Sequence, residues 1–553
     1  MTLPATQPAI EYTGPNEVRL NPAKPLPEIG PHHIVLAVEA CGICFSDTKL
    51  LHTFDRHPRK SAVTRVVGGP VTPAAELAQA LAEQPGYAPG GLPVTPGHEC
   101  VARIAAVGAA VTRHSVGERV LVQTDYRHLP TAASVAAFGY TIDGGLERYA
   151  VLDERLVIDP QTGERFLIPV DERTTAAGVA LIEPWACVEC AYAWPERQGP
   201  LPGGRRLVVA DPGHAPTGVD GWGVPVVAAA DVTRVEGLYD DIAYCGADAD
   251  VIEALGPHLA PQGLFALALG GAAVARPVQL DVGRIHYDQT RYTATAGPDL
   301  AAAYARIPAV TELRPGEKVA IIGAAGPMGL MHTVRAAVAG IAGLEIEAVD
   351  VDNARLARLA AVVDPLAQAH GVPCRCHNST AEPLTGPYSY IAVLVPAPAL
   401  LAQAVSLAGD GAIVNAFAGF PVGTVAALDL NHVARHGVYL VGTSGSRIPD
   451  MRAVLAKVES GRLDTTVSLD AVTGLGGVAD ALAAVDNRTS GGKIMVYPGI
   501  ADLPLTRLAE LPERYPAVAA AMAGGRWTTA AEAALADVTG TATTSVTAVA
   551  GAE

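Results

Sequence analysis

The clearest pattern along the chain is a run of four apolar residues, 319–322, that leads directly into three regularly spaced glycines. The run is typical of a buried parallel strand, and residues 330–339 beyond the glycines have the composition of a helix. Glycines let the backbone approach a pyrophosphate, and the N–H groups and dipole of a helix N-terminus favour an anion. The residues assigned to this turn are Gly323, Gly326, Pro327, Met328 and Gly329.

The next apolar run, 344–349, ends in Asp350, where a carboxylate can accept hydrogen bonds from a ribose diol. The spacing G-x-x-G-x-x-G departs from G-x-G-x-x-G, so a glycine turn without a ligand is the alternative. Strand, turn, helix, strand and terminal acid together favour a dinucleotide site. Asp350 repels a 2′-phosphate, which predicts NAD rather than NADP. Asp352 strengthens this prediction and the nearby Arg355 weakens it.

A repeat covers the middle of the chain. Strand and helix patterns alternate from 205 to 300, and residues 316–497 repeat the order more fully. The corresponding landmarks are Tyr239 and Tyr388, Asp281 and Asp429, and Tyr292 and Tyr439. Two tandem Rossmann-like domains explain the repeat, although any two α/β segments share some of this likeness.

The first copy lacks the glycine turn. Its opening strand runs into DPGHAPTG, which starts at Asp211 and leaves little room for a helix. We therefore expect a degenerate, structural copy and one NAD per chain. The predicted domains are a β-rich catalytic zinc domain at 1–195, the degenerate copy at 196–310, the NAD domain at 311–500, and C-terminal helices with a disordered tail at 501–553.

Composition narrows the function classes. With 553 residues, the chain is too long for one core, and its net charge of −17 argues against nucleic acid or anionic membranes as partners. The first 15 residues show no signal-peptide pattern, and no apolar run reaches the ~20 residues of a membrane helix. Eight cysteines in so long a chain do not make a disulfide scaffold, which predicts a cytoplasmic protein.

Three segments carry groups that bind metals. GICFSD contains Cys44, PGHE contains His98, and the predicted helix 181–192 opens with an EP pair that contains Glu183. A thiolate, an imidazole and a carboxylate suit a tetrahedral zinc with one position open for substrate. Asp47 and Glu99 would support the ligands, because a ligating histidine normally has a carboxylate partner.

Other cysteines offer rival sites. A four-cysteine structural zinc would use two C-x-x-C pairs, but it leaves GHE and Ser46–Asp47 unexplained. Its members would be Cys41, Cys44, Cys187 and Cys190. A further cluster, Cys374-x-Cys376-His377, is interpreted as surface.

The motifs GIC-x-SD, GHE, VGERV, DGGLERYA, EP and the glycine turn occur in an order that resembles the zinc-containing medium-chain dehydrogenase/reductase superfamily. GICFSD, the EP helix and GPMGLMH are most similar to its polyol and sugar-phosphate branch. The resemblance covers about residues 30–195 and 315–500. It implies an α/β fold, with a GroES-like β-barrel catalytic domain and doubly wound parallel-sheet domains. It also places Glu183 at the third metal position.

Three departures from the family pattern matter. No four-cysteine cluster follows Val120, so we expect one catalytic zinc and no structural zinc. Lys49 stands where many alcohol dehydrogenases carry a proton-relay histidine, which leaves Ser46, with Asp47, as the catalytic candidates. The degenerate copy has no counterpart in ordinary members.

The resemblance implies reversible oxidation of a secondary alcohol to a ketone, on a polyol, sugar or sugar phosphate, with zinc and NAD. We expect a small-molecule substrate and a homo-oligomer. A non-catalytic nucleotide-sensing scaffold and a zinc lyase or epimerase that uses NAD transiently are the alternatives.

Overall fold

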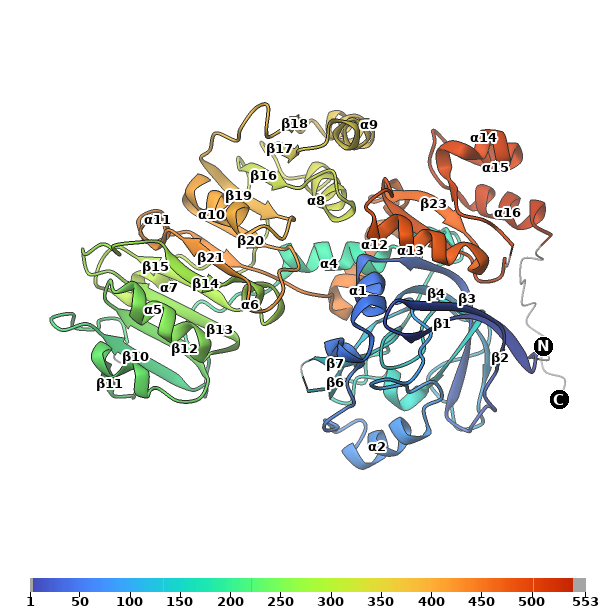
Figure 1. Cartoon of the computed structure of the whole chain (residues 1–553), viewed down its shortest axis with the longest axis horizontal. Coiled ribbons are helices and arrows are strands. Elements are labelled where there is room, and N and C mark those ends of the chain that lie inside the picture. Colours follow the sequence, from blue (N-terminus) through green and yellow to red (C-terminus); the bar gives the residue numbers. More distant parts are fainter. Residues whose placement is uncertain (1–2, 133, 220, 501, 541–553) are drawn as a thin grey trace. The chain divides into compact units, whose positions relative to one another are not determined.

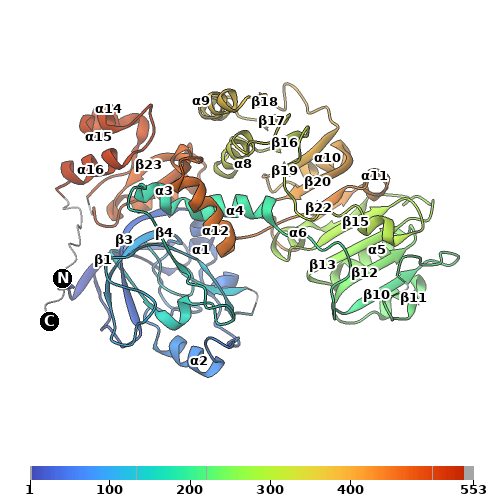
Figure 2. The same cartoon turned by 180° about the vertical axis from the view of Figure 1, so that it is seen from behind.

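The computed structural model describes residues 3–132, 134–219, 221–500 and 502–540. The chain divides into two compact units, residues 1–186 with 447–553, and residues 187–446. The first contains both ends of the chain, and the second contains its middle, green to orange in Figure 1 and seen from behind in Figure 2. In the described part of the chain, no helix is long and apolar enough to cross a membrane.

The first unit is built around an eight-stranded sheet in the order β25-β23-β24-β3-β4-β5-β9, with β8 also paired to β3. Its central strand, β3, has the sequence HIVLAVEACGI and is buried along nearly its whole length, as expected of a strand covered on both faces. Two ribbons, β1–β2 and β6–β7, complete the β-rich part. The strands are β1 (Thr6–Gly14), β2 (Glu17–Pro25), β3 (His33–Ile43), β4 (Glu99–Val107), β5 (Arg119–Val122), β6 (Asp125–Pro130), β7 (Val135–Ala137), β8 (Tyr149–Asp153), β9 (Leu167–Pro169), β23 (Leu469–Thr473), β24 (Lys493–Val496) and β25 (Thr506–Arg507).

Helices cap the ends of these strands and form the C-terminal part. The helix predicted over 181–192 is present as α4, which starts at Ile182. The helices are α1 (Phe45–Thr53), α2 (Ala74–Glu83), α3 (Ala176–Ala180), α4 (Ile182–Ala193), α12 (Ile448–Glu459), α13 (Val478–Asp486), α14 (Leu511–Arg514), α15 (Pro516–Ala521) and α16 (Thr529–Val538). The predicted C-terminal helices correspond to α14–α16, while residues 541–553 of the expected disordered tail lie outside the described residues.

Residues 447–500 belong to the first unit, although the sequence analysis grouped them with the NAD domain. The reason is strand pairing: β24 joins β3 in antiparallel register, with Ile494 opposite Ile43 and Val496 opposite Cys41. β23 then pairs with β24 in parallel. A local pattern identifies such strands but does not say which sheet they join.

The second unit holds one eleven-stranded sheet, ordered β11-β10-β12-β13-β15-β22-β20-β19-β16-β17-β18. The strands are β10 (Arg206–Ala210), β11 (Val226–Ala228), β12 (Tyr239–Cys245), β13 (Leu259–Ala268), β15 (Arg291–Thr295), β16 (Lys318–Ile322), β17 (Glu345–Asp350), β18 (Cys374–Asn378), β19 (Tyr388–Val393), β20 (Ala408–Ala416) and β22 (Tyr439–Val441). A separate ribbon pairs β14 (Val278–Asp281) with β21 (Val425–Leu428).

The two halves of this sheet are the two predicted Rossmann-like copies. Within each half every pair is parallel, and only β15 and β22, at the junction, run antiparallel. Parallel neighbours require helical crossovers. The helices are α5 (Ala249–Leu255), α6 (Val282–Tyr287), α7 (Leu300–Tyr304), α8 (Pro327–Ala337), α9 (Asn353–His370), α10 (Pro398–Leu407) and α11 (Leu430–His436). One hydrophobic core runs through both copies, from Leu207 to Leu440.

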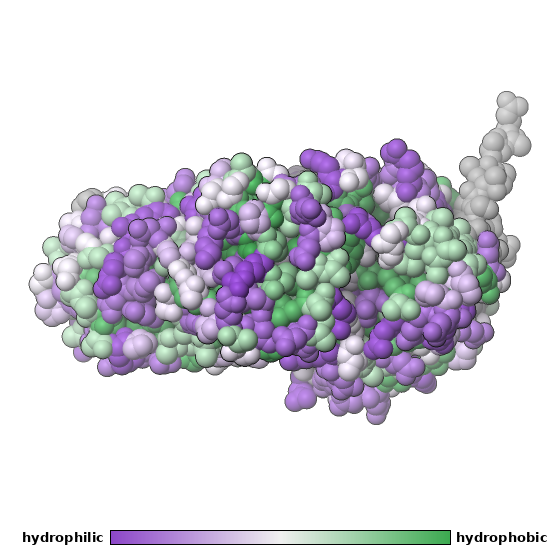
Figure 3. All heavy atoms as spheres, turned by 90° about the horizontal axis from the view of Figure 1, so that it is seen from above, coloured by the Kyte–Doolittle hydropathy of each residue, from purple (hydrophilic) through white to green (hydrophobic). Residues whose placement is uncertain are grey.

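The surface is mixed in character. On the face shown in Figure 3, hydrophilic and hydrophobic residues lie interspersed. Large exposed apolar side chains are spread along the sequence, from Leu20 to Val538. Single exposed apolar residues of this kind are normal for folded proteins.

A buried ion pair supports the junction of the two copies. Arg291 of β15 binds Glu196 at 3.0 Å, and both side chains are at most 5% exposed. The hydroxyl of Tyr439, on β22, donates to the same carboxylate at 2.6 Å. The guanidinium also donates to the Gly442 carbonyl at 2.7 Å. The pKa of Arg291 is raised because these carboxylate and phenol groups outweigh its burial.

We predict that Glu196→Ala destabilises the second unit by about 3–5 kcal/mol, because it leaves the Arg291 charge buried and unpaired. Urea unfolding followed by circular dichroism measures the effect as a lower midpoint. Asp231→Ala, which removes an exposed pair with Arg234, is the control and should change little. Equal midpoints for Glu196→Ala and the unmodified protein would contradict the assignment.

Candidate functional site

Three neighbouring strand ends build the candidate metal site. β3 ends at Ile43, and Cys44 follows as the N-cap of α1. β4 begins at Glu99, directly after His98, and its first residue pairs with Gly42. β24 begins at Lys493 on the other side of β3. Antiparallel pairing therefore brings the thiol, the imidazole, the carboxylate and an ammonium together at one end of these three strands.

Cys44, His98 and Glu99 each offer one ligand atom, and these atoms lie within 4.8 Å of one another. His98 and Glu99 are 3% and 0% exposed. One Glu99 oxygen pairs with the Lys493 ammonium, whereas Oε2 is buried with no hydrogen-bond partner. A buried carboxylate oxygen without a partner is costly unless a further group satisfies it. Together the thiol, imidazole and carboxylate suit a zinc ion.

Asp47 and Ser46 hold the first of these groups in place. The Asp47 carboxylate accepts the Cys44 backbone N–H at 2.8 Å and, through Oδ1, lies 3.2 Å from His98 Nδ1. The Ser46 hydroxyl donates to the Cys44 sulfur at 3.0 Å. The predicted support of the histidine by Asp47 is thus present in the geometry. It leaves the other ring nitrogen of His98 for the metal.

His98 sits in a polar, closed environment. Burial favours the neutral ring, but Tyr140, Asp47 and Cys44 outweigh it and raise the pKa of His98 well above its usual value. The ring of Tyr140 lies 5.3 Å from that of His98, centre to centre. Burial in turn raises the pKa of Tyr140 to about 12. The phenol therefore stays protonated at neutral pH.

Glu183, predicted as the third ligand, is not in the group of three. It is 7% exposed, in the first turn of α4. Burial first, then the charges of Glu99 and Asp125, raise its pKa to about 7, while His98 and Lys493 act against the shift. The structure thus puts Glu99, predicted as a supporting residue, closer to Cys44 and His98. The Glu183 carboxyl remains within electrostatic range of the site, and the ligand set stays a prediction.

The sequence analysis missed several residues of this site. Lys493 is 394 positions away from Glu99, and no local pattern connects the two. Tyr140 precedes DGGLERYA and is identified only by its contact with His98. His57 also lies beside Tyr140, 5.2 Å between ring centres. Burial first, then Arg59, Lys49 and His98, lower the pKa of His57 to about 3, which makes it a neutral ring.

The other cysteines of the rival clusters lie in surroundings different from those of Cys44. The thiol of Cys41 is buried and hydrogen-bonded to Cys100, and burial raises its pKa well above the usual value. Among the residues that the structure describes, Cys44, His98 and Glu99 form the only group of three or more candidate ligands. Cys374 and Cys376 lie on β18, at the outer edge of the eleven-stranded sheet, and are partly buried.

The glycine turn joins β16 to α8 as the pattern predicts. Gly323 has φ of +86°, a backbone conformation that side chains disfavour. A side chain at Gly329 would collide with the backbone of Gly323 and Ala324, so this glycine permits close packing of helix on turn. Gly326 is the N-cap of α8, and a Cβ added there would meet its nearest neighbour, the Arg355 guanidinium, at 3.5 Å. The turn therefore leaves its helix N-terminus open to an anion.

Asp350 ends β17 beside this turn. Its carboxylate accepts the N–H of Ala325 at 3.1 Å and that of Val351 at 2.8 Å. The side chain is thus fixed at the carboxyl ends of β16 and β17, as a ribose-binding acid requires. Arg355, on α9, supplies a cation at the same turn.

The first copy is different at the equivalent place. Beyond β10, the described residues between Asp211 and β11 contain no helix. Asp211 instead accepts the Tyr244 hydroxyl at 2.7 Å and the Ala247 N–H at 3.0 Å. A pocket of about 560 Å³ there is lined by several acidic residues, among them Asp248 and Asp250. His214 and Arg276 also line this pocket, but Arg276 is paired with Asp250 and Glu253, so the aspartates of the lining disfavour a pyrophosphate.

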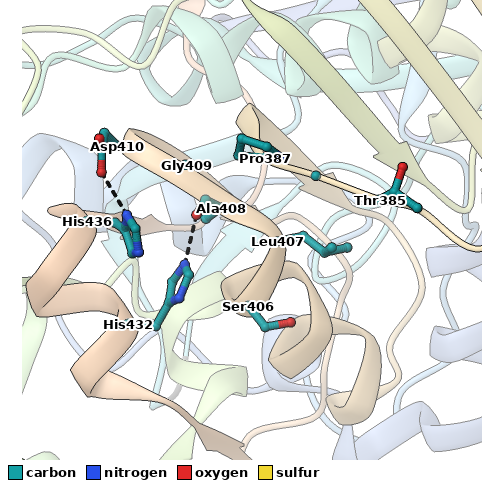
Figure 4. A pocket seen from close by; sticks show the side chains of 10 residues that line it. Thr385, Pro387, Ser406, Leu407, Ala408, Gly409, Asp410, His432 and His436 are labelled. Carbon is teal, nitrogen blue, oxygen red and sulfur yellow. Dashed lines mark hydrogen bonds and ion pairs between the residues drawn. The ribbon is translucent and has the colours of Figure 1, made fainter.

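A second pocket, of about 430 Å³, lies at the amino ends of β19 and β20 (Figure 4). His436 pairs with Asp410 at 2.7 Å, and His432 contacts the Ala408 carbonyl oxygen at 2.8 Å. The glycine turn follows the carboxyl end of β16, so it lies at the opposite ends of these parallel strands. Ligands of such sheets bind at the carboxyl ends of the strands. This pocket is therefore no candidate for the coenzyme.

Comparison with known proteins gives a domain match and several partial relatives. Residues 30–161 match the alcohol dehydrogenase GroES-like domain. An uncharacterized protein of Escherichia coli (strain K12), YggP, is 28% identical over 215 residues, which are 36% of this chain and 50% of the relative. L-sorbose 1-phosphate reductase of Klebsiella pneumoniae is 30% identical over 231 residues, 40% of this chain and 56% of the relative. Mannitol-1-phosphate 5-dehydrogenase of Aliivibrio fischeri is 28% identical over 222 residues, which are 37% of this chain and 51% of the relative. The chain spans about half the length of these curated relatives.

Solved structures share the fold at low identity. 2R,3R-butanediol dehydrogenase from Bacillus subtilis aligns over 89% of this chain and 100% of its own, with a TM-score of 0.52 and 16% identity. A Sinorhizobium meliloti 1021 protein bound to NADP is described as a zinc-binding dehydrogenase. It aligns over 90% of this chain and 100% of its own, with a TM-score of 0.50 and 14% identity. The GroES-like match and the α/β architecture thus make the chain similar in fold to the zinc-containing medium-chain dehydrogenase/reductase superfamily.

Proposed function

We propose that the protein is a zinc- and NAD(H)-dependent dehydrogenase that interconverts a secondary alcohol and a ketone of a polyol, sugar or sugar phosphate. The observation that carries this proposal is the group of partly buried Cys44 with buried His98 and Glu99, of which Glu99 has an unpartnered oxygen. The names of two relatives, a sorbose-phosphate reductase and a mannitol-phosphate dehydrogenase, support the substrate class. Their partial coverage keeps the substrate a proposal.

In this proposal Cys44, His98 and Glu99 hold the zinc. When bound, zinc supplies a Lewis acid that polarises the substrate oxygen and lowers the pKa of an alcohol. Asp47 orients the His98 ring, and Lys493 forms a buried ion pair with the Glu99 carboxylate. The open position needed for substrate follows from a set of three protein ligands.

Proton movement is assigned to the chain's own groups. Ser46 Oγ, adjacent to Cys44 Sγ, is the first relay candidate because its hydroxyl can both donate and accept. The Glu183 carboxyl, with a pKa of about 7, can take up or release a proton near neutral pH. His57 is held neutral and can accept a proton only at low pH. When bound, the coenzyme would supply the nicotinamide as the hydride acceptor.

The coenzyme is assigned to the glycine turn of the second copy. The open N-terminus of α8 suits the pyrophosphate, and Asp350 suits the ribose hydroxyls. Asp350 favours NAD, whereas Arg355 at the same turn can attract a 2′-phosphate. We propose NAD as the preferred coenzyme because the carboxylate is fixed by two backbone N–H groups.

We predict about one zinc per chain and NADH formation with at least one compound in a panel of polyols and sugar phosphates. His98→Ala and Glu99→Ala should each lose zinc and turnover, because they remove a ligand. Elemental analysis measures zinc, absorbance at 340 nm measures NADH, and circular dichroism checks folding.

Glu183→Gln is the matched variant for this test. It removes the charge but keeps the shape, and it should retain zinc while its pH–rate profile changes. Full zinc retention in Glu99→Ala together with zinc loss in Glu183→Gln would reverse the two assignments. Zinc retention in His98→Ala would contradict the assignment of the metal site.

For the coenzyme, we predict that Asp350→Ser raises the ratio of kcat/KM for NADP over NAD at least about tenfold, equivalent to about 1.4 kcal/mol. Removal of the carboxylate removes its repulsion of the 2′-phosphate. Arg355→Ala should move the ratio the other way. Steady-state kinetics with both coenzymes give the ratio, and an unchanged value in both variants would show that other residues recognise the ribose.

Finally, titration calorimetry with NADH should give a stoichiometry near one per chain. The pocket of the first copy is lined by three aspartates, and the N-terminus of α5 beside it is already capped by the Asp248 side chain. Gly326→Asp, which has room for its Cβ but adds a negative charge to the turn, should abolish binding. A stoichiometry near two, with one phase surviving in Gly326→Asp, would show that the first copy binds coenzyme.

A further inference from the structure

The two Rossmann-like copies meet at two places in the second unit. β15 of the first copy pairs antiparallel with β22 of the second in the large sheet. β14 pairs antiparallel with β21 in the separate ribbon. Figure 1 labels β14 and β21, and Figure 2 labels β15 and β22, where the green first copy meets the orange part of the second. These are the equivalent strands of the two copies.

The register of the large sheet shows which positions correspond. Each copy has a row of three residues that pair side by side across its last three strands. The two rows are Ile242–Phe265–Tyr292 and Ile391–Val414–Leu440. Ile242 and Ile391 occupy the same place in the repeated segments YDDIAY and YSYIAV. Their rows end in Tyr292 and Leu440, and these two residues pair with each other across the junction.

The ribbon gives the same result independently. Asp281 and Asp429 are the N-caps of α6 and α11, where each accepts a backbone N–H of its own helix. Counting back two residues from these caps gives Gln279 and Ala427. These two positions also pair with each other. Both junctions are therefore centred on a pair of equivalent residues.

Equivalent positions face each other in antiparallel strands when a twofold axis runs between the strands. This is the geometry of an isologous interface, which two identical subunits normally form. Here both halves belong to one chain. The junction is as well packed as a domain interior: Val278, Leu280, Ala426 and Leu428 of the ribbon are at most 2% exposed. The Arg291–Glu196 pair is buried beside it.

We propose that the first copy is a built-in partner, so that one chain forms by itself the isologous unit that otherwise needs two. The copy occupies the edges of β22 and β21, and these edges are closed to a second chain. The proposal stands on strand register and does not depend on zinc or coenzyme. If the protein forms the expected homo-oligomer, it does so through other surfaces.

Single cysteines on the axis test this inference. Gln279 and Ala427 are both exposed, so Gln279→Cys and Ala427→Cys should fold. In the double variant, mild oxidation with copper–phenanthroline and oxygen should join the two sulfurs within one chain. The product should run at the 56.7 kDa of a single chain on a non-reducing denaturing gel and should resist alkylation at both positions. Neither single variant should form a covalent dimer.

The twofold axis between the strands also predicts which cross-links would contradict the proposal. In a dimer formed through β21 of two chains, position 427 would face itself, and Ala427→Cys alone would give a disulfide-linked dimer. A covalent dimer from the double variant would show exchange of the copies between chains. Full alkylation of both thiols in the oxidised double variant would show that the ribbon is absent. Each of these results overturns the proposal.

Val425→Cys is the matched control, because Val425 is also exposed on β21 but pairs with Asp281 and lies off the axis. It should not cross-link in either arrangement. The unmodified protein, treated in the same way, accounts for the eight native cysteines.

Discussion

The buried charge of Glu99 is the constraint on which the first unit's chemistry depends. A carboxylate that is 0% exposed must be compensated, and Lys493 reaches only one of its oxygens. Gly42 lies opposite it, and a side chain there would force the Glu99 carboxylate to shift. The register of β3 and β4 places Gly42 opposite Glu99, and the pairing of β24 with β3 brings Lys493 to the same carboxylate.

The coenzyme turn could be predicted from sequence because its physics is local. The positive φ of Gly323, the close packing at Gly329 and the carboxylate of Asp350 all lie within 28 residues and act through neighbouring backbone. The duplication was also visible, because strand order and landmark residues repeat along the chain. The structure confirms two parallel half-sheets in the predicted order.

The metal site was predictable only in part, because its members come from separate strands. Cys44 and His98 carry recognisable motifs, and the structure brings them together. The relation between Glu99 and Glu183 was not predictable, since it depends on how β4 and α4 are placed around His98. Lys493 was not predictable at all: its charge has meaning only through a strand pairing 394 residues away from Glu99. The same long-range pairing placed residues 447–500 with the first unit.

The two copies in the second unit have diverged unevenly, and the pattern of divergence follows the physics of each region. The crevice of the first copy has an aspartate hydrogen-bonded across the carboxyl ends of its strands, in place of an open helix N-terminus. The junction, by contrast, keeps paired equivalent positions and capping aspartates in both copies. Replacement of the glycine turn changes only a surface loop. Loss of the junction would instead expose the apolar edge of a core that both halves share. The first copy can therefore stay indispensable to the fold of the second even if, as proposed, only the second binds coenzyme.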